Sequence, residues 1–590
     1  MENKINKNLL ISVAKGNGSI KVLWGALTLV LFFLGLANSS WAADFYIAPN
    51  QAGTNDGSTC ANARAVDWFN TTSNWANPKQ TGKIGPGDTV HLCGTFTASS
   101  ANTTMFTVRG GGSASAGYIT IKFEDDAVLQ SPQWGTDGAI LIHSYYGATG
   151  YIIIDGGKNG IIRNTANGTG LTNHAASTGI AVFGWYNVPV SHFEITNLTI
   201  KDIYKNLGNV YMALDTDGQA TTTISVGGNL DNFSIHDNKV YAARTGINIS
   251  YEGSHHDNAD IYNNYIADHD WGIVYGAGSQ STEASANNVK IHDNEITDFD
   301  NWQCPSQSHF CCPPDADCTA VHGANYNDLY HTDGIFLEQV MSATNVFSPL
   351  IYNNYFHGNL GRANVTAFIF CTSETWTLPP AGHGATSCNI FNNLFLMSGA
   401  SSPAIWMAAA SYHSKIFNNT VIGDPTNIGG VPFVLNGIGD TFKNNLVTKG
   451  YNRAMFAGYP EAKDSITTSD YNLWNEISYI KSNDTAFCAG SYTGPGCSSG
   501  FCTYDGWKTM GYDVHSTTGD PKLSGTYFPG LDSSAIGLGE NLTHLGITAL
   551  NSDKAGNPRP STGPWDIGAY EYVPGGDTTA PAAPTGLTVQ

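Results

Sequence analysis

The chain has 590 residues, of which 27 are Lys or Arg and 48 are Asp or Glu, so its formal charge is −21. This acidic balance argues against nucleic acid or acidic lipid as a partner. Its 66 Gly residues and its aromatic content of 11% favour many short strands joined by turns, and its length leaves room for more than one domain.

Residues 1–42 have the features of a secretory signal peptide. Several lysines precede the apolar run 22–37, and Ser40 and Ala42 supply small residues at the cleavage spacing, so we expect cleavage after Ala42. The alternative is an uncleaved membrane anchor, but the apolar run is short for a bilayer span. We therefore expect a secreted protein, extracellular or at the cell surface, with a formal charge of −24 and no membrane span after cleavage.

The eleven cysteines of an exported chain favour disulfides over metal or redox sites. Cys60 and Cys93 flank the first strand region, and Cys371 and Cys388 bracket one loop. The dense insert "CPSQSHFCCPPDADC" (304–318) has zinc binding with His309 as an alternative. The odd total leaves at least one thiol unpaired or joined to another chain.

An apolar-x-x-Asn-x-apolar motif recurs along the chain. The second Asn of each copy is Asn238, Asn264, Asn294, Asn354, Asn393, Asn419 or Asn445, with gaps of 26, 30, 60, 39, 26 and 26. A basic period of 26 with loop insertions indicates a repeat architecture. The segment "EITNLTI" (194–200) is a degenerate earlier copy.

Each repeat contains three short apolar strands separated by turns, such as "ADIY", "YI" and "WGIVYG" around Asn264. Three such strands cannot bury their apolar faces alone, but stacked repeats bury them as a continuous core. We therefore predict an all-β parallel β-helix with three strands per rung and about ten or more rungs. In this arrangement Asn would occupy a tight left-handed turn, and its amide would bond to the Asn one rung away for about 1 kcal/mol net.

This pattern resembles the right-handed parallel β-helix proteins of the pectate-lyase-like superfamily, over roughly residues 150–450. The resemblance extends to an entry segment at 45–58 and 84–96, where a short helix caps the coil, and to closing segments at 533–539, 553–560 and 566–572. We expect a β-helix domain over 43–573, divided into 43–150 (cap and first rungs), 151–450 (regular rungs) and 451–573 (last rungs and closing segment). The Pro/Thr-rich tail 574–590 resembles the opening of a fibronectin type III module but is too short to form one, so we expect it to be disordered.

Equivalent residues of stacked repeats form columns about 4.8 Å apart. Alignment of the third strands on Gly246, Gly272 and Gly334 predicts one column that contains the candidate catalytic residues Arg244, His269, Asp270, His331 and Asp333. The candidate substrate-binding residues beside it are Trp271, Tyr330, Glu338 and Arg362. The Cys-bearing insert (298–331) enters the chain just before "HTDGI" and would form a wall over the same face. The resemblance implies a polysaccharide groove along this strand and its preceding turn.

Several reactions fit this column. Two carboxylates one rung apart, Asp270 and Asp333, lie near the spacing of retaining glycosidases, in which they would serve as acid and base or nucleophile. Alternatively, the pair would hold Ca²⁺ while His331 or Arg244 acts as the base of a polysaccharide lyase. The negative charge of the chain favours a neutral glycan, or an acidic glycan assisted by a cation.

Two classes of function remain open. The first is a secreted polysaccharide lyase or glycoside hydrolase that acts in a groove along the rungs. The second is a non-catalytic exported β-helix that binds glycans or serves as a surface or adhesion protein, because the full catalytic motif set of a pectinase, alginate lyase or polygalacturonase family is missing. In either case we expect a monomer with polysaccharide as its partner, and Ca²⁺ is the one cofactor considered.

Overall fold

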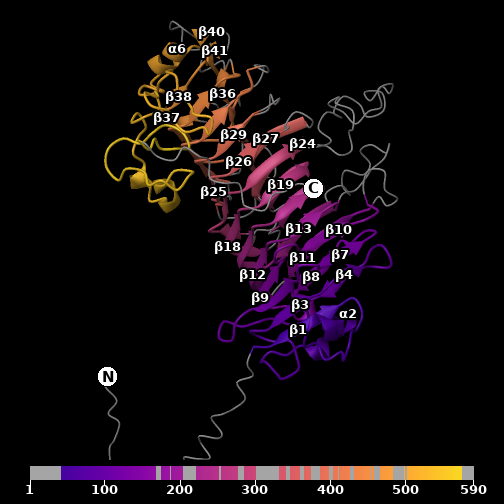
Figure 1. The fold of residues 1–590 in the computed structure, drawn as a ribbon. Helices are drawn as coiled ribbons and strands as arrows, with labels where there is room; N and C mark the ends of the chain where they lie inside the picture. Colours follow the sequence, from indigo (N-terminus) through magenta and orange to yellow (C-terminus); the bar gives the residue numbers. More distant parts are fainter. Residues whose placement is uncertain are drawn as a thin grey trace, which may run out of the picture.

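The protein is a stack of short strands that climbs as an elongated coil (Figure 1). The computed structural model describes residues 42–574, apart from 168–174, 186–187, 204–220, 251–253, 277–284, 300–330, 340–345, 359–363, 374–385, 398–402, 409–410, 426–430, 452, 458–465, 483–496 and 499–500. Residues 1–41, which make up nearly all of the predicted signal peptide, most of the Cys-bearing insert (298–331) and the tail beyond residue 574 therefore lie outside the described residues.

Three long sheets form the sides of the coil. The first sheet contains, in spatial order, β2 (Arg64–Ala65), β1 (Asp44–Ala48), β3 (Thr89–Leu92), β6 (Ile119–Phe123), β9 (Gly150–Asp155), β12 (Val190–Thr196), β15 (Leu230–His236), β18 (His255–Tyr262), β22 (Lys290–His292), β25 (Leu350–Tyr352), β28 (Asn389–Phe391), β31 (Lys415–Phe417), β34 (Asp440–Lys443) and β37 (Ile466–Asp470), with β21 (Ser285–Asn287) paired to β18.

The second sheet contains β4 (Thr95–Thr97), β7 (Val128–Ser131), β10 (Ile161–Asn164), β13 (Thr199–Lys201), β16 (Lys239–Tyr241), β19 (Tyr265–His269), β23 (Glu295–Phe299), β26 (Tyr355–His357), β29 (Leu394–Leu396), β32 (Thr420–Ile422), β35 (Leu446–Thr448) and β38 (Leu473–Trp474).

The third sheet contains β11 (Ser177–Gly184), β14 (Thr221–Gly228), β17 (Thr245–Ser250), β20 (Trp271–Gly276), β24 (His331–Gln339), β27 (Asn364–Ser373), β30 (Ile405–Met407), β33 (Phe433–Leu435), β36 (Arg453–Ala457) and β39 (Tyr479–Ser482), and ends in the antiparallel strands β41 (Phe501–Cys502) and β40 (Cys497–Ser498). A separate pair, β5 (Phe106–Thr107) and β8 (Ile140–His143), precedes β11. Ala139 beside β8 donates its N–H to the carbonyl of Gly179 in β11 at 2.7 Å, so β8 continues the line of the third sheet.

Successive rungs place like residues above one another. In the first sheet Ile195, Ile235, Ile261, Ile291 and Ile351 are partners in register, and all are fully buried. Each coil thus buries its apolar residues against the same positions of the next coil, since no rung could bury them alone. The predicted parallel β-helix with three strands per rung is confirmed.

A ladder of buried asparagines runs along the turn between the first and second sheets. Oδ1 of Asn264 accepts the backbone N–H (3.2 Å) and the Nδ2 group (3.1 Å) of Asn238, and Nδ2 of Asn264 donates to the carbonyl of Ile235 at 2.8 Å. The members, all at most 1% exposed, are Asn238, Asn264, Asn294, Asn354, Asn393, Asn419, Asn445 and Asn472. The predicted amide contacts between rungs are confirmed, and Asn472 extends them by one rung.

The left-handed residue of this turn is the one before each ladder asparagine, which corrects the sequence-based assignment. Asn263 (φ 51°), Asp293 (φ 53°) and Asn353 (φ 57°) adopt this conformation. Asn and Asp tolerate it better than most residues because their short polar side chains bond locally. In each copy of the motif, the residue before the ladder asparagine therefore forms the turn, and the ladder asparagine bonds to the neighbouring rungs.

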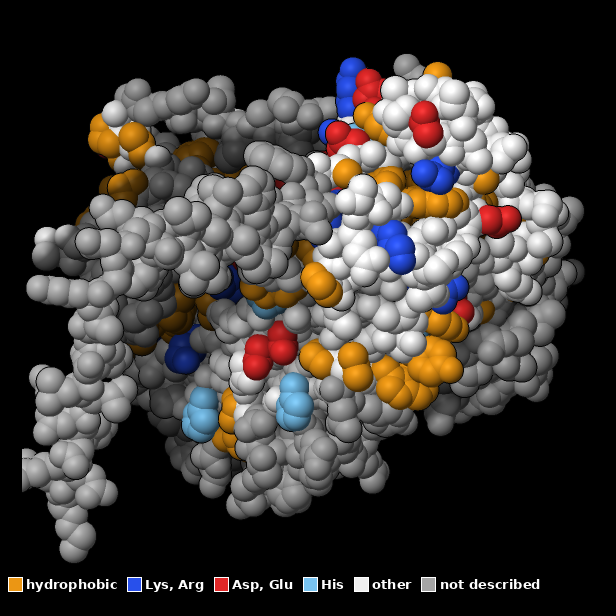
Figure 2. All heavy atoms as spheres, turned by 90° about the horizontal axis from the view of Figure 1, so that it is seen from below, with side chains coloured by type: hydrophobic (Ala, Val, Ile, Leu, Met, Phe, Trp, Pro, Cys, Tyr) orange, Lys and Arg blue, Asp and Glu red, His pale blue; other side chains and the backbone are white. Residues whose placement is uncertain are grey.

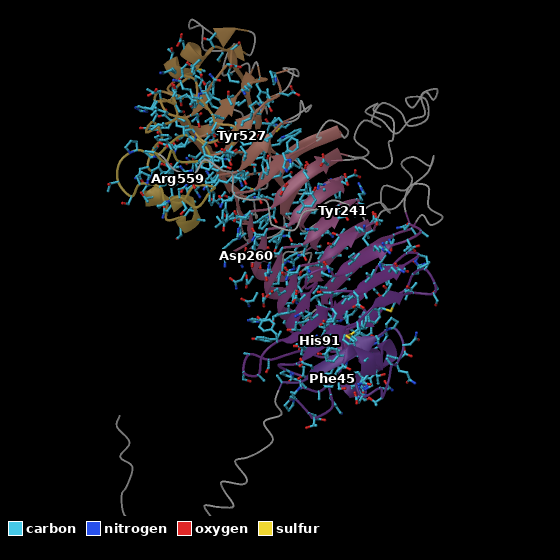
Figure 3. The ribbon with its side chains drawn as sticks, viewed as in Figure 1. Phe45, His91, Tyr241, Asp260, Tyr527 and Arg559 are labelled. Carbon is cyan, nitrogen blue, oxygen red and sulfur yellow. A yellow bond between two sulfur atoms is a disulfide. The ribbon has the colours of Figure 1, made fainter. Side chains whose placement is uncertain are left out.

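On the last rungs the first asparagine of each Asn-Asn pair also holds the closing segment, residues 517–572, against the side of the coil. The amide nitrogens donate to backbone carbonyls of that segment: Asn392 to Ser552 (2.7 Å), Asn418 to Gly568 (3.1 Å) and Asn444 to Glu540 (2.9 Å). Figure 3 shows Tyr527 and Arg559 of this segment beside the upper rungs. Arg559 is buried and donates from Nη2 to Oδ1 of Asn392 at 2.9 Å. The motifs that resemble a closing segment thus pack onto the outside of the last coils.

Helices are few and short in the described residues. They are α2 (Val66–Asn70), α6 (Tyr504–Thr509) and the 3-10 turns η1 (Cys60–Asn62), η2 (Thr72–Asn74), η3 (Ser144–Tyr146), η6 (Thr543–Leu545) and η7 (Thr548–Asn551). Helix α2 lies at the N-terminal end of the coil (Figure 1), where its buried Phe69 packs edge-on against Phe106 at 5.1 Å between ring centres. A short helix therefore lies at the N-terminal end of the coil, where the resemblance implies one. None of the helices in the described part of the chain has the length and apolar character needed to span a bilayer.

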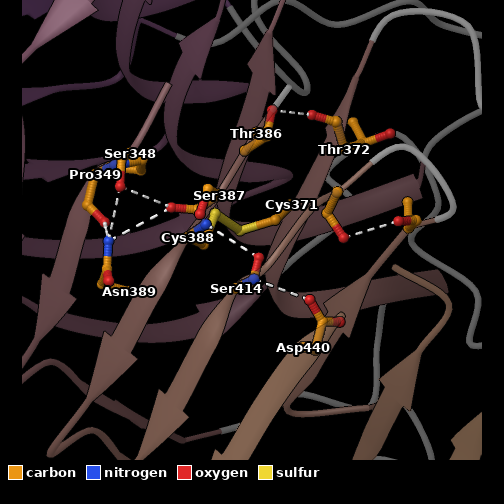
Figure 4. The surroundings of a disulfide bond; sticks show 12 residues. Ser348, Pro349, Cys371, Thr372, Thr386, Ser387, Cys388, Asn389, Ser414 and Asp440 are labelled. Atoms are coloured by element: carbon orange, nitrogen blue, oxygen red, sulfur yellow. Dashed lines mark hydrogen bonds between the residues drawn. A yellow bond between two sulfur atoms is a disulfide. The ribbon is translucent and has the colours of Figure 1, made fainter. Parts of the chain in front are cut away.

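Two disulfides join the cysteines that flank the first strand region and one loop. Cys60 is bonded to Cys93, and Cys371 is bonded to Cys388 (Figure 4). Cys502 is also disulfide-bonded, and no described cysteine is free. The cysteines of the insert at 304–318 lie outside the described residues, so zinc binding there stays a prediction.

A buried carboxyl lies close to the second disulfide. The N–H of Ser414 donates to Oδ1 of Asp440 at 2.9 Å, and Oγ of Ser414 accepts the N–H of Cys388 at 3.1 Å (Figure 4). Burial raises the pKa of Asp440 to about 8. The folded protein therefore keeps this carboxyl protonated at neutral pH, while the unfolded chain ionises it near pH 4.

We expect the Asp440→Asn variant to resist alkaline pH better than the wild-type protein. A carboxyl with a raised pKa stabilises the fold fully only below its unfolded pKa, and this contribution is lost as the pH rises from about 4 to about 8. An isosteric amide cannot ionise. Denaturant unfolding at pH 5 and pH 8 should show the wild-type protein losing stability relative to Asp440→Asn, and equal pH dependence of the two proteins would contradict this assignment.

Candidate functional site

The predicted column exists in the backbone. Thr245, Trp271 and Asp333 are partners in register on β17, β20 and β24. The carbonyl of Arg244 accepts the N–H of Asp270 at 3.1 Å, and the carbonyl of Asp270 accepts the N–H of Asp333 at 3.0 Å. Residues far apart in the chain therefore meet at the turn into the third sheet, and the two carboxylates occupy adjacent rungs.

Glycines set how closely these rungs approach. A Cβ atom at Gly246 would lie 2.5 Å from the carbonyl oxygen of Gly272, and one at Gly272 would lie 2.4 Å from the carbonyl oxygen of Gly334. Any side chain at these two positions would push the strands apart. The glycines used for the alignment are thus a packing requirement of the third sheet.

The side chains of the column are buried. Arg244 is 3% exposed, Asp270 is 2% exposed and Asp333 is fully buried. Nε of Arg244 lies 3.4 Å from Oδ2 of Asp270, and its guanidinium carbon lies 4.8 Å from the centre of the Trp271 ring. Oδ1 of Asp333 accepts the N–H of Ala367 at 3.1 Å. Arg244 and Asp270 form a buried ion pair that stacks on an aromatic ring.

His269 is enclosed in the same region. It is 1% exposed, and its Nε2 atom would lie 3.2 Å from a Cβ atom at Gly272. Burial lowers the pKa of His269 to about 3, so the ring is neutral at pH 7. In register it pairs with Phe299 of β23, whereas His331 begins β24 and pairs with Asn364. The alignment predicts His269 and His331 as neighbours on adjacent rungs, and the described strand pairs do not join them in register.

The structure describes some of the other candidate residues and leaves others outside the described part of the chain. Trp271 and Glu338 are half-buried, and the Trp271 ring stacks on Phe336 at 6.0 Å between ring centres. The backbone of His331 lies in β24, but its side chain is outside what the structure describes. Tyr330 and Arg362 lie outside the described residues. Among the described residues, no group of three or more His, Cys, Asp and Glu side chains is arranged to hold a metal ion.

An open groove lies on the outer face of the third sheet, over the rungs that lead up to and include β17, the first strand of this column. Its volume is about 720 Å³, and its lining comes from β8, β11, β14, β17 and the turn at residues 136–137. Ala181, Ser225 and Asn248 form one column of its floor, and Phe183, Gly227 and Ser250 form a second. The floor therefore combines small side chains with hydroxyl and amide groups.

The floor columns lead toward the predicted site. Asn248 pairs with Val274, which pairs with Phe336, and Ser250 pairs with Gly276, which pairs with Glu338. Trp271 and Asp333 stand at the start of the same strands. The groove and the column thus belong to consecutive strands of one sheet.

Exposed aromatic side chains gather at the N-terminal end of the groove. Tyr145 is 70% exposed, Tyr146 37%, Phe183 40% and Trp185 44%. They surround the half-buried ring of His143, which lies 5.1 Å from Phe183 and 5.7 Å from Trp185 between ring centres. We call these five residues the aromatic cluster. The aligned repeats begin at Gly246 and do not reach this cluster, although "HSYYG" (143–147) and "VFGWY" (182–186) are dense in aromatic residues.

Among the described residues, the N-terminal end of the coil carries no surface of one charge sign. Seen from the N-terminal end, acidic, basic and apolar side chains of the described residues are interspersed (Figure 2).

No family model matches the sequence, and no curated protein matches it. Solved structures with a similar backbone include pectate lyase Pel9A, with 13% identity over 90% of this chain and 97% of that chain and a TM-score of 0.40. The GH136 lacto-N-biosidase from Eubacterium ramulus has 12% identity over 73% of this chain and 66% of that chain, with a TM-score of 0.41. XylC in complex with xylose has 10% identity over 90% of this chain and 98% of that chain, with a TM-score of 0.39. At these identities and scores, the function of the chain has to be inferred from its own residues.

Proposed function

We propose that the chain is an exported carbohydrate-active protein that holds a glycan along the outer face of the third sheet. The groove of about 720 Å³ carries this proposal, because it is open and combines polar floor residues such as Ser225 and Asn248 with aromatic side chains. Hydroxyl and amide groups suit the hydroxyls of a sugar, and aromatic faces suit its CH groups. The formal charge of −21 favours a neutral glycan over a polyanionic one.

Within this function, the reaction would be hydrolysis or β-elimination at the column where the groove strands continue. Asp270 and Asp333 come from adjacent rungs, whose backbones are roughly 4.8 Å apart, with Asp333 in register with Trp271, the residue after Asp270. A retaining glycosidase would need the two carboxyl groups about 5–5.5 Å apart. In a lyase, His331 or Arg244 would instead act as the base, and the two carboxylates would hold Ca²⁺.

The second candidate function is glycan binding without catalysis, in a surface or adhesion protein. The burial of the column favours it, because Arg244, His269, Asp270 and Asp333 are each at most 3% exposed. A catalytic group has to reach the reacting atoms of its substrate. The open groove and its aromatic residues serve a binding protein equally well.

A panel of purified polysaccharides separates these functions. The mature protein is incubated with neutral and uronate-containing glycans, with and without Ca²⁺, and reducing ends, unsaturated products and binding are all measured. Products with a neutral glycan support the hydrolase, unsaturated products support the lyase, and binding without products supports the second candidate. Neither binding nor products with any glycan would contradict the proposed function as a whole.

A further inference from the structure

The aromatic cluster is a built surface rather than a chance gathering of rings. The N–H of Trp185 donates to Oγ of the buried Ser144 at 2.7 Å, which fixes the Trp185 backbone against η3. Tyr145 lies 5.8 Å from Trp185 and 5.1 Å from Tyr146 between ring centres. Rings that stay exposed while their backbones are fixed present flat apolar faces at low conformational cost.

Arg109 and His143 hold the two tyrosines of the cluster in place. The guanidinium carbon of Arg109 lies 5.0 Å from the centre of the Tyr146 ring, and Nε of Arg109 donates to the carbonyl of Asn70 at 3.0 Å. Nδ1 of His143 accepts the N–H of Tyr145 at 3.0 Å, so the neutral ring carries its hydrogen on Nε2. Burial lowers the pKa of His143 while Asp137 opposes the shift, which keeps the ring neutral at pH 7.

The cluster and the groove are continuous. His143, Phe183 and Trp185 line the groove together with Ser225 and Asn248. From β11 to β17 the floor rises by two rungs, roughly 10 Å in total. A single extended ligand that lies on the floor would therefore reach the aromatic rings at the N-terminal end of the groove.

We propose that the aromatic cluster is a sugar-stacking subsite that takes a neutral pyranose unit of the glycan in the groove, with Trp185 and Tyr145 as its principal stacking faces. This inference rests on the proposed function and adds where the glycan is gripped and which class it belongs to. The mixture of exposed rings with a hydroxyl- and amide-bearing floor fits a carbohydrate better than an apolar protein surface, which would lack the polar floor.

The charge of the groove selects among glycans. Of its described lining residues, Asp137 is the one with a formal charge at pH 7 when His143 is neutral, and that charge is negative. The Arg109 guanidinium beside Tyr146 is engaged with that ring and with the carbonyl of Asn70 and does not line the groove, so the described lining offers a polyanionic glycan no cationic partner. The subsite is therefore assigned to uncharged sugar units.

The test is calorimetric titration of the mature protein with a neutral oligosaccharide chosen from the polysaccharide panel. We expect Trp185→Ala and Tyr145→Ala each to weaken binding about tenfold or more, as is usual for truncated aromatic anchors, while Trp185→Phe keeps most of the affinity. Tyr118→Ala is the matched control, because Tyr118 is 37% exposed and precedes β6 of the first sheet. It should bind as the wild-type protein does. Thermal unfolding checks that each variant is folded.

The outcomes separate the subsite from the proposed function. If the wild-type protein binds or cleaves a neutral glycan but Trp185→Ala and Tyr145→Ala bind it with unchanged affinity, the subsite is wrong and the proposed function stands. If the affinity falls in the Tyr118→Ala control as much as in the cluster variants, the cluster is not the subsite. If the wild-type protein binds anionic glycans alone, the assignment to neutral sugars is overturned, and if it binds no glycan, both inferences fall.

Discussion

The Asn354→Ala variant is expected to lose roughly 3 kcal/mol or more of unfolding free energy, because it opens the asparagine ladder at its centre. Oδ1 of Asn354 accepts the backbone N–H of Asn294 at 3.1 Å and its Nδ2 group at 3.0 Å, and Nδ2 of Asn354 donates to the carbonyl of Ile291 at 3.0 Å. Alanine would remove all three of these bonds, although the Asn294 Nδ2 group would keep its bond to the carbonyl of Ile261 at 3.0 Å. Each loss of a partner from a buried polar group costs about 1–3 kcal/mol.

Denaturant unfolding of the mature protein measures this loss. Asn287→Ala is the matched control, since Asn287 is exposed and its amide bonds to Asp257 at 2.8 Å on the surface. It should change the stability by less than about 0.5 kcal/mol. Equal stability of Asn354→Ala and Asn287→Ala would show that the ladder does not hold the rungs together.

Breaking the buried Arg244–Asp270 pair is the second change with a large expected effect. Arg244→Met should cost roughly 3–5 kcal/mol, because it leaves the Asp270 carboxylate buried without its guanidinium partner 3.4 Å away. The double variant Arg244→Met, Asp270→Leu should recover much of this stability, since replacing a whole buried pair by apolar side chains is often neutral. Unfolding free energies of Arg244→Met, Asp270→Leu and the double variant measure the coupling between the two side chains.

The same double variant reports on catalysis. If it is stable but cleaves no glycan that the wild-type protein cleaves, the pair acts in the reaction. If it keeps the activity, the pair is structural.

The control for the stability measurement is the pair of Lys290 and Asp260, which are 3.9 Å apart and about one-third exposed. Lys290→Met should cost less than about 1 kcal/mol. A loss as small as this in Arg244→Met would contradict the assignment of a buried ion pair.

Most of the fold could be predicted from the sequence repeat. The 26-residue period and the asparagine positions predicted stacked three-strand rungs, because burial of the same apolar position in every coil forces the sequence to repeat itself. The left-handed position was misassigned within each "NN" pair, since either residue type fits such a turn and only the backbone shows which one makes it. The docking of Asn392 and Asn418 on the closing segment could not be foreseen either, because it joins residues about 150 positions apart.

The candidate site was predicted less completely. Alignment on the glycines brought Arg244, Asp270 and Asp333 to adjacent rungs, since register follows from the repeat. Burial does not follow from it, because exposure depends on how loops and neighbouring rungs cover a side chain. The aromatic cluster stayed hidden for a related reason: Tyr145 and Trp185 come from an irregular turn and a strand end, and their meeting is decided in three dimensions.

A crystal structure of the mature protein with a bound neutral oligosaccharide tests the central claim most directly. The proposed function predicts that the sugar lies on the outer face of the third sheet, above Ser225 and Asn248, with one ring against Trp185 or Tyr145. A sugar bound on the first or second sheet, with the groove left open, would contradict it.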